Sequence, residues 1–394
     1  MSSIAISLTP NRNRSLSRLS LRPAGIKPSR RTNRNTKKSF CKCIHKPICK
    51  TALQVLAKYI MTTISKVAER AGVSRTTVSH VLNHADRVTP HLRERVLQAV
   101  AELGYSPNRQ AQSLRTGRTN IIAMLIPDIR NPFYPELVKT VQTDLEAVGL
   151  DTLIFNTDVP GGHSHEHVQE YLRQIRSKRF DGLIIGDFAL HGMHDALLNI
   201  DIPTVFIGKL RNQAVDSLRV DDEGACYNMG KYLAQRGHRR VAQITGPHFF
   251  EEAMDRARGL RNGLLDSGVA PADILEWEGT FLAPSGTEGV DWLLETHKHD
   301  MPTALFFGNH LMTLGGIARL FDHGLRIPQD LSVAVYGDQP QMNYIRPHLT
   351  RAGVQPAAQA HVATRMLLER LDGTYIGPPR TEVLTGSLHQ MDSA

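Results

Sequence analysis

The periodicity of hydrophobic positions changes twice along the 394-residue chain. Residues 1–60 show no apolar period, and residues 61–106 repeat with a helical period. From Asn120 onwards, apolar runs of strand length alternate with amphipathic stretches. This pattern predicts a disordered basic extension, a small all-α domain, and a larger α/β core at 120–394.

The helical part predicts three short helices. The first has an apolar face between Ile64 and Ala71, with Thr63 as its N-cap, and Gly72 permits a tight turn after it. Ser74 is expected to cap the second helix, and Thr89-Pro90 to open the third. Two helices joined by a glycine-containing turn at this spacing indicate a helix-turn-helix motif.

The second predicted helix, within GVSRTTVSHVLN at 72–83, has two contrasting faces. Val78, Val81 and Leu82 share one face and are expected to pack inward. The opposite face carries Arg75, Thr76, Ser79, His80 and Asn83. Arginine and short hydrogen-bonding groups suit the major groove of DNA, where they reach phosphates and base edges. The alternative is an ordinary solvated helix in a three-helix scaffold.

The core predicts two lobes, each built on a parallel sheet covered by helices on both faces. The first set of strand-like runs is IIAMLIP, DTLIF, DGLIIG and IPTVFIG, with helices at 134–148 and 165–179. The second set is VAQITG, ILEWEG, TALFFGN and LSVAVYG, with helices at 252–267 and 311–323. Small molecules bind such folds at the carboxyl ends of the strands, in the crevice between lobes.

Charge is distributed unevenly among these parts. Residues 1–60 hold 14 Lys/Arg and no Asp/Glu, residues 61–119 have a net charge of +5, and residues 120–394 have −10. A basic segment ahead of an acidic body is typical of a nucleic-acid contact joined to a module with another role. Only Cys226 lies outside the first 60 residues, which suggests a reducing compartment.

The first 60 residues permit three interpretations: a targeting peptide, a basic arm for phosphate contacts, or a segment that is not translated because synthesis starts at Met61. We favour the start at Met61, since nothing upstream is needed to fold the rest of the chain. The group Cys41, Cys43, His45 and Cys49 has no ordinary zinc-finger spacing.

The segments TTISKVAERAGVSRTTVSHVLN and VTPHLRERVLQAVAELGYSPNRQAQSLRTGRT resemble the LacI/GalR (lactose-repressor/galactose-repressor) family of bacterial transcription regulators. The resemblance covers essentially all of 62–394 and implies a periplasmic-binding-protein-like core. It makes Arg75, Thr76 and His80 the expected base readers, with His80 replacing the usual arginine. The further DNA contacts expected on this domain are Thr63, Ser74, Thr77, Ser79 and Asn83.

Residues 107–119 are predicted to be a hinge. A helix of about eight residues from Arg109 is too short to hold itself in water, so it should order only against a partner. The resemblance implies minor-groove binding, with Leu114 as a wedge and Ala111 at the contact between two hinge helices. Asn108, Arg109 and Arg115 are the other expected contacts. The alternative is a plain flexible linker.

In the core, the resemblance implies an effector site formed by Phe133, Arg256, Phe281, Asn309 and Asp338. Plain core packing is the alternative for the two phenylalanines, and a surface ion pair with Glu252 is the alternative for Arg256. The family places the lobe crossovers near 218–221 and 349–355, with the chain from about Val354 back in the first lobe.

Three departures from the family pattern bear on the effector. His310 replaces the usual Asp after Asn309, and Gly208-Lys209 stand where Asp-Arg is common. Tyr336-Gly337-Asp338 lacks the first acid of the usual Gly-aromatic-Asp-Asp, which leaves Asp338 displaced by one. Fewer carboxylates and an added lysine favour a gluconate-like sugar acid over a neutral sugar.

The strand ends carry no nucleophile elbow, Walker loop or dinucleotide fingerprint, so we expect no enzyme and no cofactor. The cluster His163, His165, Glu166 and His167 offers a metal-dependent enzyme as an alternative, but residues 163, 165 and 167 do not share a helical face. Our interpretation is a cytoplasmic, nucleoid-associated bacterial repressor of carbohydrate catabolism genes. It would bind a near-palindromic operator as a homodimer under control of a sugar or sugar acid. An activator of the same family, or a small-molecule binding protein without a DNA role, are the alternatives.

Overall fold

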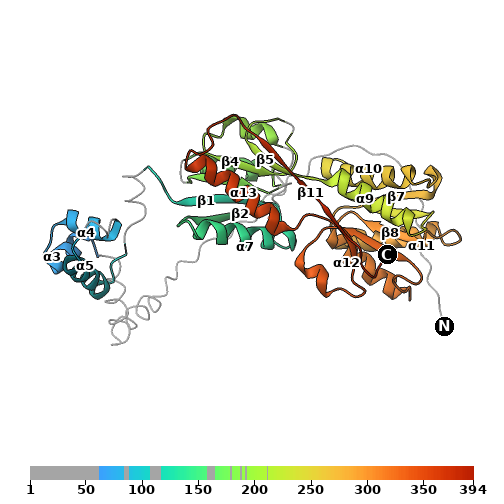
Figure 1. Cartoon of the computed structure of the whole chain (residues 1–394), viewed down its shortest axis with the longest axis horizontal. Coiled ribbons are helices and arrows are strands. Elements are labelled where there is room, and N and C mark those ends of the chain that lie inside the picture. Colours follow the sequence, from blue (N-terminus) through green and yellow to red (C-terminus); the bar gives the residue numbers. More distant parts are fainter. Residues whose placement is uncertain are drawn as a thin grey trace, which may run out of the picture. The chain divides into compact units, whose positions relative to one another are not determined.

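The computed structural model describes residues 62–83, 88–106, 117–157, 165–177, 180–186, 189–190, 193–210 and 212–394, and leaves out the side chains of Asn83, His165 and His167. The chain divides into two compact units, with the boundary after Pro107. The first unit is helical, and the second contains two six-stranded sheets (Figure 1).

The first unit contains helices α3 (Ile64–Ala71), α4 (Arg75–Asn83) and α5 (Pro90–Leu103). Val67, Val78 and Val96, one from each helix, are fully buried against one another in a single small core. Gly72 ends α3 in the left-handed conformation with φ 61°, and the Val73 amide donates to the Ala68 carbonyl at 2.9 Å. The predicted helix-turn-helix is therefore confirmed.

The N-caps of these helices follow the prediction only in part. The Thr77 amide donates to Ser74 Oγ at 3.0 Å, which confirms the Ser74 cap. Thr63 and Thr89 occupy the N-cap positions of α3 and α5, but neither side chain accepts a capping hydrogen bond. Both residues are exposed, so water can satisfy the first-turn amides there and the side-chain cap is not required.

The first lobe of the second unit has a fully parallel sheet with strand order β11-β5-β4-β3-β1-β2. Its strands are β1 (Ile121–Ile126), β2 (Asp151–Asn156), β3 (Gly182–Ile185), β4 (Thr204–Ile207), β5 (Asp216–Asp221) and β11 (Thr381–Thr385). Its helices are α7 (Phe133–Glu146), α8 (His165–Arg176), the 3-10 helix η2 (His194–Asn199) and α13 (Pro356–Leu371). Helices α7 and α13 share one buried cluster with the sheet, and α8 contributes to a second, so the sheet is covered on both faces.

The second lobe repeats this plan with strand order β12-β10-β9-β8-β6-β7, in which only β12 is antiparallel. Its strands are β6 (Val241–Thr245), β7 (Ile274–Glu278), β8 (Ala304–Phe307), β9 (Ser332–Tyr336), β10 (Thr350–Gly353) and β12 (Ser387–His389). Its helices are α9 (Asp222–Gln235), α10 (Glu251–Asp266), α11 (Ala283–Thr296), α12 (His310–Asp322) and the 3-10 helices η3 (Pro271–Asp273) and η4 (Pro340–Tyr344). The predicted α/β alternation is confirmed in both lobes.

The chain crosses between the lobes three times. The crossings after β5 and after β10 agree with the predicted positions near 218–221 and 349–355. The prediction that the chain from Val354 onwards lies in the first lobe is wrong for its end, because the chain returns at Gly386 and β12 pairs with β10. Strand β12 has only three residues, too short to show a period in the sequence.

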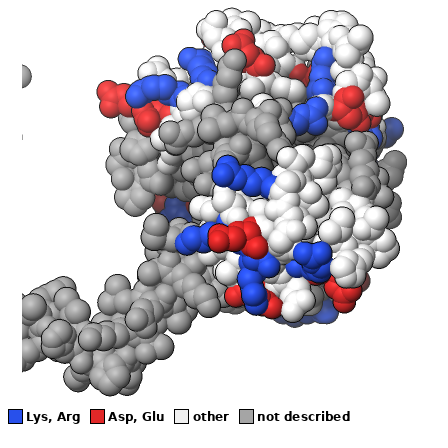
Figure 2. Space-filling view, turned by 90° about the vertical axis from the view of Figure 1, so that its left-hand side faces the viewer, with Lys and Arg blue, Asp and Glu red and all other residues white. Residues whose placement is uncertain are grey.

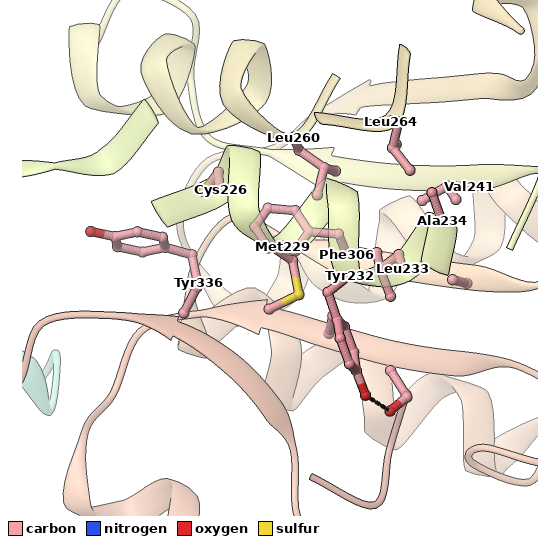
Figure 3. Packing of buried hydrophobic residues seen from close by; sticks show 14 of the residues in the cluster. Cys226, Met229, Tyr232, Leu233, Ala234, Val241, Leu260, Leu264, Phe306 and Tyr336 are labelled. Carbon is pink, nitrogen blue, oxygen red and sulfur yellow. Dashed lines mark hydrogen bonds between the residues drawn. The ribbon is translucent and has the colours of Figure 1, made fainter. Parts of the chain in front are cut away.

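This last segment is fixed by the core of the second lobe (Figure 3). Met229 and Tyr232 of α9 pack with Leu260 of α10 over the sheet, and Cys226 is fully buried in the same cluster. The Tyr232 hydroxyl donates to the Ala394 carbonyl at 2.6 Å. The third crossing is thus held by a buried hydrogen bond as well as by strand pairing.

On the face of the molecule drawn in Figure 2, Lys and Arg residues lie beside Asp and Glu residues. No helix among the described residues is both long and apolar enough to cross a membrane.

Candidate functional site

The exposed side of α4 is the first candidate site. Val78 and Val81 are buried, and Leu82 packs against the same core, as predicted. The residues on the opposite side are exposed (Arg75, Thr76 and His80) or half-buried (Thr77 and Ser79), and Thr63 and Ser74 are exposed beside them. The helix therefore presents arginine, hydroxyl and imidazole groups outward from a fixed apolar anchor, as groove recognition requires.

Two interactions between α3 and α5 fix the helices against which α4 packs. Arg70 of α3 pairs with Glu102 of α5, with Nε and Oε2 2.7 Å apart. Arg95 of α5 donates to the Ala71 carbonyl at 2.5 Å, which satisfies an open carbonyl at the end of α3. Neither contact uses a residue of the exposed side of α4, so neither competes with a partner for that side.

Several predicted residues lie outside the described part of the chain. These are the hinge residues Asn108, Arg109, Ala111, Leu114 and Arg115, the Asn83 side chain, and the histidines of the proposed metal cluster at 163–167. The cysteine cluster at 41–49 and the start at Met61 also lie outside it. Their predicted roles stay predictions.

The second candidate site is a cleft of about 610 Å³ between the lobes of the core. This volume is in the range of small-molecule sites. Phe133 and Lys209 line it from the first lobe, and Phe250, Arg256 and Phe281 line it from the second. The structure therefore brings together Phe133, Arg256 and Phe281 as predicted, and it adds residues that the sequence did not single out.

The aromatic side of the cleft depends on an unusual backbone. Phe281 has a positive φ of 65°, which is uncommon for a non-glycine residue. The Asn309 amide nitrogen donates to the Phe281 carbonyl at 2.7 Å and holds this turn. The Phe281 ring occupies space over Gly246, where a Cβ would lie 2.0 Å from it, and its centroid is 6.2 Å from that of Phe250. Such strain persists where the surrounding structure enforces it, most often at binding sites.

Arg256 forms the floor of the cleft. Its Nε donates to Asp222 at 3.0 Å, and its Nη1 donates to the Gly308 carbonyl at 3.1 Å. Its guanidinium carbon lies 3.8 Å from the centroid of the Tyr336 ring. Burial disfavours the charged guanidinium, but the nearby Asp222 carboxylate more than offsets this and raises the pKa of Arg256 above its usual value. The alternative of a surface pair with Glu252 is wrong, because the pair is buried and Asp222 is the partner.

Polar contacts from Lys209 join the two lobes across the cleft. Lys209 follows β4 of the first lobe, and its Nζ lies 2.7 Å from Asp255 Oδ2 on α10 of the second. The Lys209 amide also donates to Glu252 Oε1 at 3.1 Å. Glu252 is buried, and burial raises the pKa of its carboxyl. The Lys209 ammonium group is therefore already paired with carboxylates of α10 and is not a free cation in the cleft.

Asn309 and His310 begin α12 at the edge of the cleft. Asn309 lines the cleft, as predicted. Its side-chain oxygen Oδ1 already accepts a hydrogen bond from the Met312 backbone amide at 2.9 Å, which caps α12. The His310 ring is buried and lines the cleft, and burial lowers its pKa to about 4, so it is neutral at physiological pH.

Asp338, which was expected to contact the effector, lies outside the cleft in the structure. Its Oδ1 pairs with Arg351 Nε at 2.6 Å, its Oδ2 lies 3.3 Å from His389 Nε2, and it is not among the residues lining the cleft. Arg351 belongs to β10 and His389 to β12. The Asp338 carboxylate is therefore held against the paired strands β10 and β12, and the sequence did not predict this pairing. The neighbouring Gln339 faces the cleft instead.

The sequence reasoning also missed Asp222, Glu252 and Gln339 as cleft residues. Asp222 follows Asp221 directly at the end of β5, and acidic residues at the carboxyl end of a strand are a signal for a site. Glu252 lies one helical turn before Arg256, so the placement of that arginine could have indicated it.

Comparison with known proteins finds relatives of both units of the chain. Residues 63–108 match the family of bacterial regulatory proteins, lacI family, and residues 231–393 match the periplasmic binding protein-like domain. The HTH-type transcriptional repressor PurR of Erwinia tasmaniensis is 34% identical over 320 residues, covering 79% of this chain and 91% of that protein. PurR of Aliivibrio fischeri is also 34% identical, over 321 residues, covering 79% and 92%.

Two solved structures share the arrangement over 84% of this chain. The Lac repressor bound to ONPG in its repressed state has 26% identity and a TM-score of 0.73, with 99% of that chain covered. The complex of the transcriptional regulator CelR with cellobiose has 28% identity and a TM-score of 0.61, with 100% of that chain covered.

A helix-turn-helix unit joined to a two-lobed core with a central cleft defines a class, the ligand-controlled DNA-binding transcription regulators. Within that class, this chain belongs to the lacI family of bacterial regulatory proteins. It is a DNA-binding transcriptional repressor with a ligand-binding core, not an enzyme. A further structural relative, the Lac repressor, is solved as a dimer bound to its operator and the anti-inducer ONPF, with 25% identity and a TM-score of 0.72. The alternative of a binding protein without a DNA role is therefore wrong.

Proposed function

We propose that this repressor controls genes of carbohydrate catabolism in the cytoplasm and that its effector is a neutral sugar. The observation that carries the proposal is the cleft between the lobes, which is lined both by half-buried phenylalanine rings and by buried hydrogen-bonding side chains. Aromatic rings offer apolar faces to the C–H side of a sugar, and polar side chains orient its hydroxyls. CelR, a structural relative, forms a complex with cellobiose, which supports an effector of this class.

The charges in the cleft argue for a neutral sugar over the gluconate-like acid favoured by the sequence. Six carboxylates line the cleft against three Lys/Arg residues. Lys209 and Arg256, the cations expected to attract an anion, are both already paired with carboxylates. An aldonate would have to compete with Asp255 for Lys209 or with Asp222 for Arg256, and the exposed Arg219 would be its other counter-ion among six acidic groups. Loss of two acids from the family pattern is thus offset by acids from α9 and α10.

On the DNA side, we propose that the exposed face of α4 reads each half of a near-palindromic operator. Arg75, Thr76 and His80 are the base readers, and Thr63, Ser74, Thr77, Ser79 and Asn83 support them with backbone or base contacts. Residues 107–119 form the hinge, with Leu114 as a minor-groove wedge, Ala111 at the hinge-helix contact, and Asn108, Arg109 and Arg115 on the backbone. Replacing Leu114 by Ala should reduce operator bending, and unchanged bending would contradict the wedge.

Selection of binding sites from random duplexes by the full chain, followed by fluorescence anisotropy at physiological salt, tests this function. We expect a near-palindromic site, bound more tightly than its scrambled version by a factor of about 10³ or more. Neutral sugars such as glucose or cellobiose should change operator affinity by about 5- to 150-fold, as expected for coupled sites, and gluconate should not. Equal binding to operator and scrambled DNA, with and without sugar, would overturn the proposal.

A further inference from the structure

The segment that follows β4 in the first lobe turns toward α10 of the second lobe. Gly208 has a φ of 135°, a conformation that glycine adopts without strain, and its amide donates to the Leu218 carbonyl of β5 at 2.7 Å. The backbone of this turn is therefore fixed to the first lobe. The next residue, Lys209, reaches across the cleft with both its side chain and its backbone amide.

The side chain of Lys209 forms the first bridge between the lobes. Its Nζ donates to Asp255 Oδ2 at 2.7 Å and lies 3.6 Å from Glu251 Oε2. The Lys209 side chain is 31% exposed and that of Asp255 is 14% exposed, so water and salt screen this pair less than a surface pair. Burial disfavours the charged ammonium, but the hydrogen bond and charge of Asp255 more than offset this and raise the pKa of Lys209.

The backbone amide of Lys209 forms the second bridge. It donates to Glu252 Oε1 at 3.1 Å, and the Glu252 side chain is buried. This hydrogen bond joins an amide of one lobe to a carboxylate of the other, so it breaks whenever the lobes separate. Exchange of this amide proton with solvent therefore reports how often the lobes part.

The acceptor of the first bridge is anchored within the second lobe. Asp255 Oδ1 accepts from Arg258 Nη2, and Arg258 Nε donates to Glu223 of α9 at 2.9 Å. The Asp255 carboxylate is thus held in position independently of Lys209, which lowers the entropic cost of forming the bridge. Arg258 would also remain as a cationic partner of Asp255 if the lysine were replaced.

We propose that Lys209 forms an ionic lock, the Lys209–Asp255 pair, which holds the two lobes of the core together without help from an effector. Both bridges are made by groups of this chain, and both end on the first turns of α10. A ligand-controlled repressor responds according to the free-energy difference between two core arrangements. The ionic lock stabilises only the arrangement in which the lobes are joined, so Lys209 sets part of that difference. The inference does not depend on the chemistry of the effector.

Hydrogen–deuterium exchange of the free full-length protein tests the ionic lock without effector or DNA. Lys209→Met removes the ammonium group but keeps the backbone amide. The protection factor of the amide at position 209 should fall about tenfold, which corresponds to the loss of one charge-assisted hydrogen bond. Protection within β1 and β6 should stay as in the parent, because each lobe keeps its own core.

Lys298→Met, at an exposed position of the second lobe, is the matched control and should keep the parent protection at position 209. Unchanged protection of this amide in Lys209→Met would overturn the proposal. A loss of protection in β1 and β6 as large as that at position 209 would show general destabilisation of the core and would also overturn it.

The partner of Lys209 is tested by Asp255→Asn and by the double variant. Asp255→Asn should lower the protection at position 209, and Lys209→Met combined with Asp255→Asn should lower it no further than the stronger of the two single changes. This non-additivity is expected when two substitutions remove the same interaction. Additive losses would mean that the two residues act separately, and they would overturn the ionic lock.

Operator binding connects the ionic lock to regulation. The affinity of free Lys209→Met for the selected operator should differ from that of the parent by about 5-fold or more, as for other coupled sites, while its affinity for scrambled DNA stays the same. Lys298→Met should match the parent on both duplexes. Equal operator affinity of Lys209→Met and the parent would overturn the regulatory role of the ionic lock. Equal binding of the parent to operator and scrambled DNA would instead overturn the proposed function.

Discussion

The guanidinium carbon of Arg256 lies 3.8 Å from the centroid of the Tyr336 ring, and Arg256 Nε donates to Asp222 at 3.0 Å. This stack joins the start of α9, the middle of α10 and the end of β9, which are the segments that form the floor of the cleft. Burial, and then the Asp222 carboxylate, raise the pKa of the Tyr336 hydroxyl, so the cluster holds one cation and one anion. Its integrity determines both the stability of the second lobe and the shape of the effector site.

Replacing Arg256 by Met should destabilise the core by about 3–5 kcal/mol, because it leaves the Asp222 carboxylate buried without its partner. Urea unfolding followed by fluorescence measures this loss. Arg326→Met is the matched control, since Arg326 pairs with Asp330 at the surface, and it should have little effect. Equal effects of the two substitutions would contradict a buried ion pair at the floor of the cleft.

His310 should make the core sensitive to mild acid. Burial lowers the pKa of its ring to about 4, from 6.5 in the unfolded chain. The folded state disfavours the protonated ring, so the contribution of neutral His310 is fully present above pH 6.5 and is lost as the pH falls through 4. The total loss is about 3 kcal/mol, as given by the difference between the two pKa values.

Unfolding of His310→Gln between pH 7 and pH 4 measures this effect. The free energy of unfolding of the variant should fall less steeply with pH than that of the parent protein. His299→Gln, at an exposed position, should keep the parent profile. Parallel profiles for the parent and His310→Gln would mean that the ring is not held neutral by the fold.

Local signals in the sequence predicted the local structure well. The helix-turn-helix was predicted from the apolar spacing between Ile64 and Ala71, from Gly72 and from Ser74. Each of these signals depends only on residues a few positions away in the sequence. The strand-like runs from Ile121 to Tyr336 predicted four strands of each sheet for the same reason, since strands covered on both faces are continuously apolar. Strands β5, β10, β11 and β12 were not among these runs.

The cleft was less predictable, because its residues depend on contacts between distant segments. Asp338 has the right residue type in the right loop, but the pairing of β12 with β10 brings His389 and Arg351 to it and removes it from the cleft. Lys209 has the right charge for an anion, yet α10 of the other lobe neutralises it through Asp255. Neither partner is visible from the spacing of residues around these positions.

Arg75 should contribute to sequence recognition more than to general DNA affinity. Arg75 is exposed at the start of α4. If its guanidinium forms hydrogen bonds with a base, Arg75→Ala should weaken binding to the selected operator by about 1–3 kcal/mol. Anisotropy titrations with operator and scrambled duplexes at the same salt concentration measure the difference. Arg93→Ala, an exposed arginine on α5, is the matched control and should preserve the ratio of the two affinities. An equal loss on both duplexes for Arg75→Ala would show a phosphate contact instead.

The contact between α11 and α12 links packing to the cleft, because α12 begins at Asn309 and His310. A Cβ on Gly286 of α11 would lie 1.9 Å from the Met312 carbonyl oxygen in the first turn of α12. Gly286→Ala must therefore push the two helices apart, at a cost of about 3 kcal/mol in the free energy of unfolding. Glu288→Ala, on the exposed side of the same helix, should change stability by less than about 0.5 kcal/mol.

Because Asn309 both caps α12 and holds the Phe281 carbonyl, displacement of α12 should also weaken sugar binding in Gly286→Ala. Unfolding and titration of both variants test this, and full stability of Gly286→Ala would show that the helices are free to separate without affecting the site.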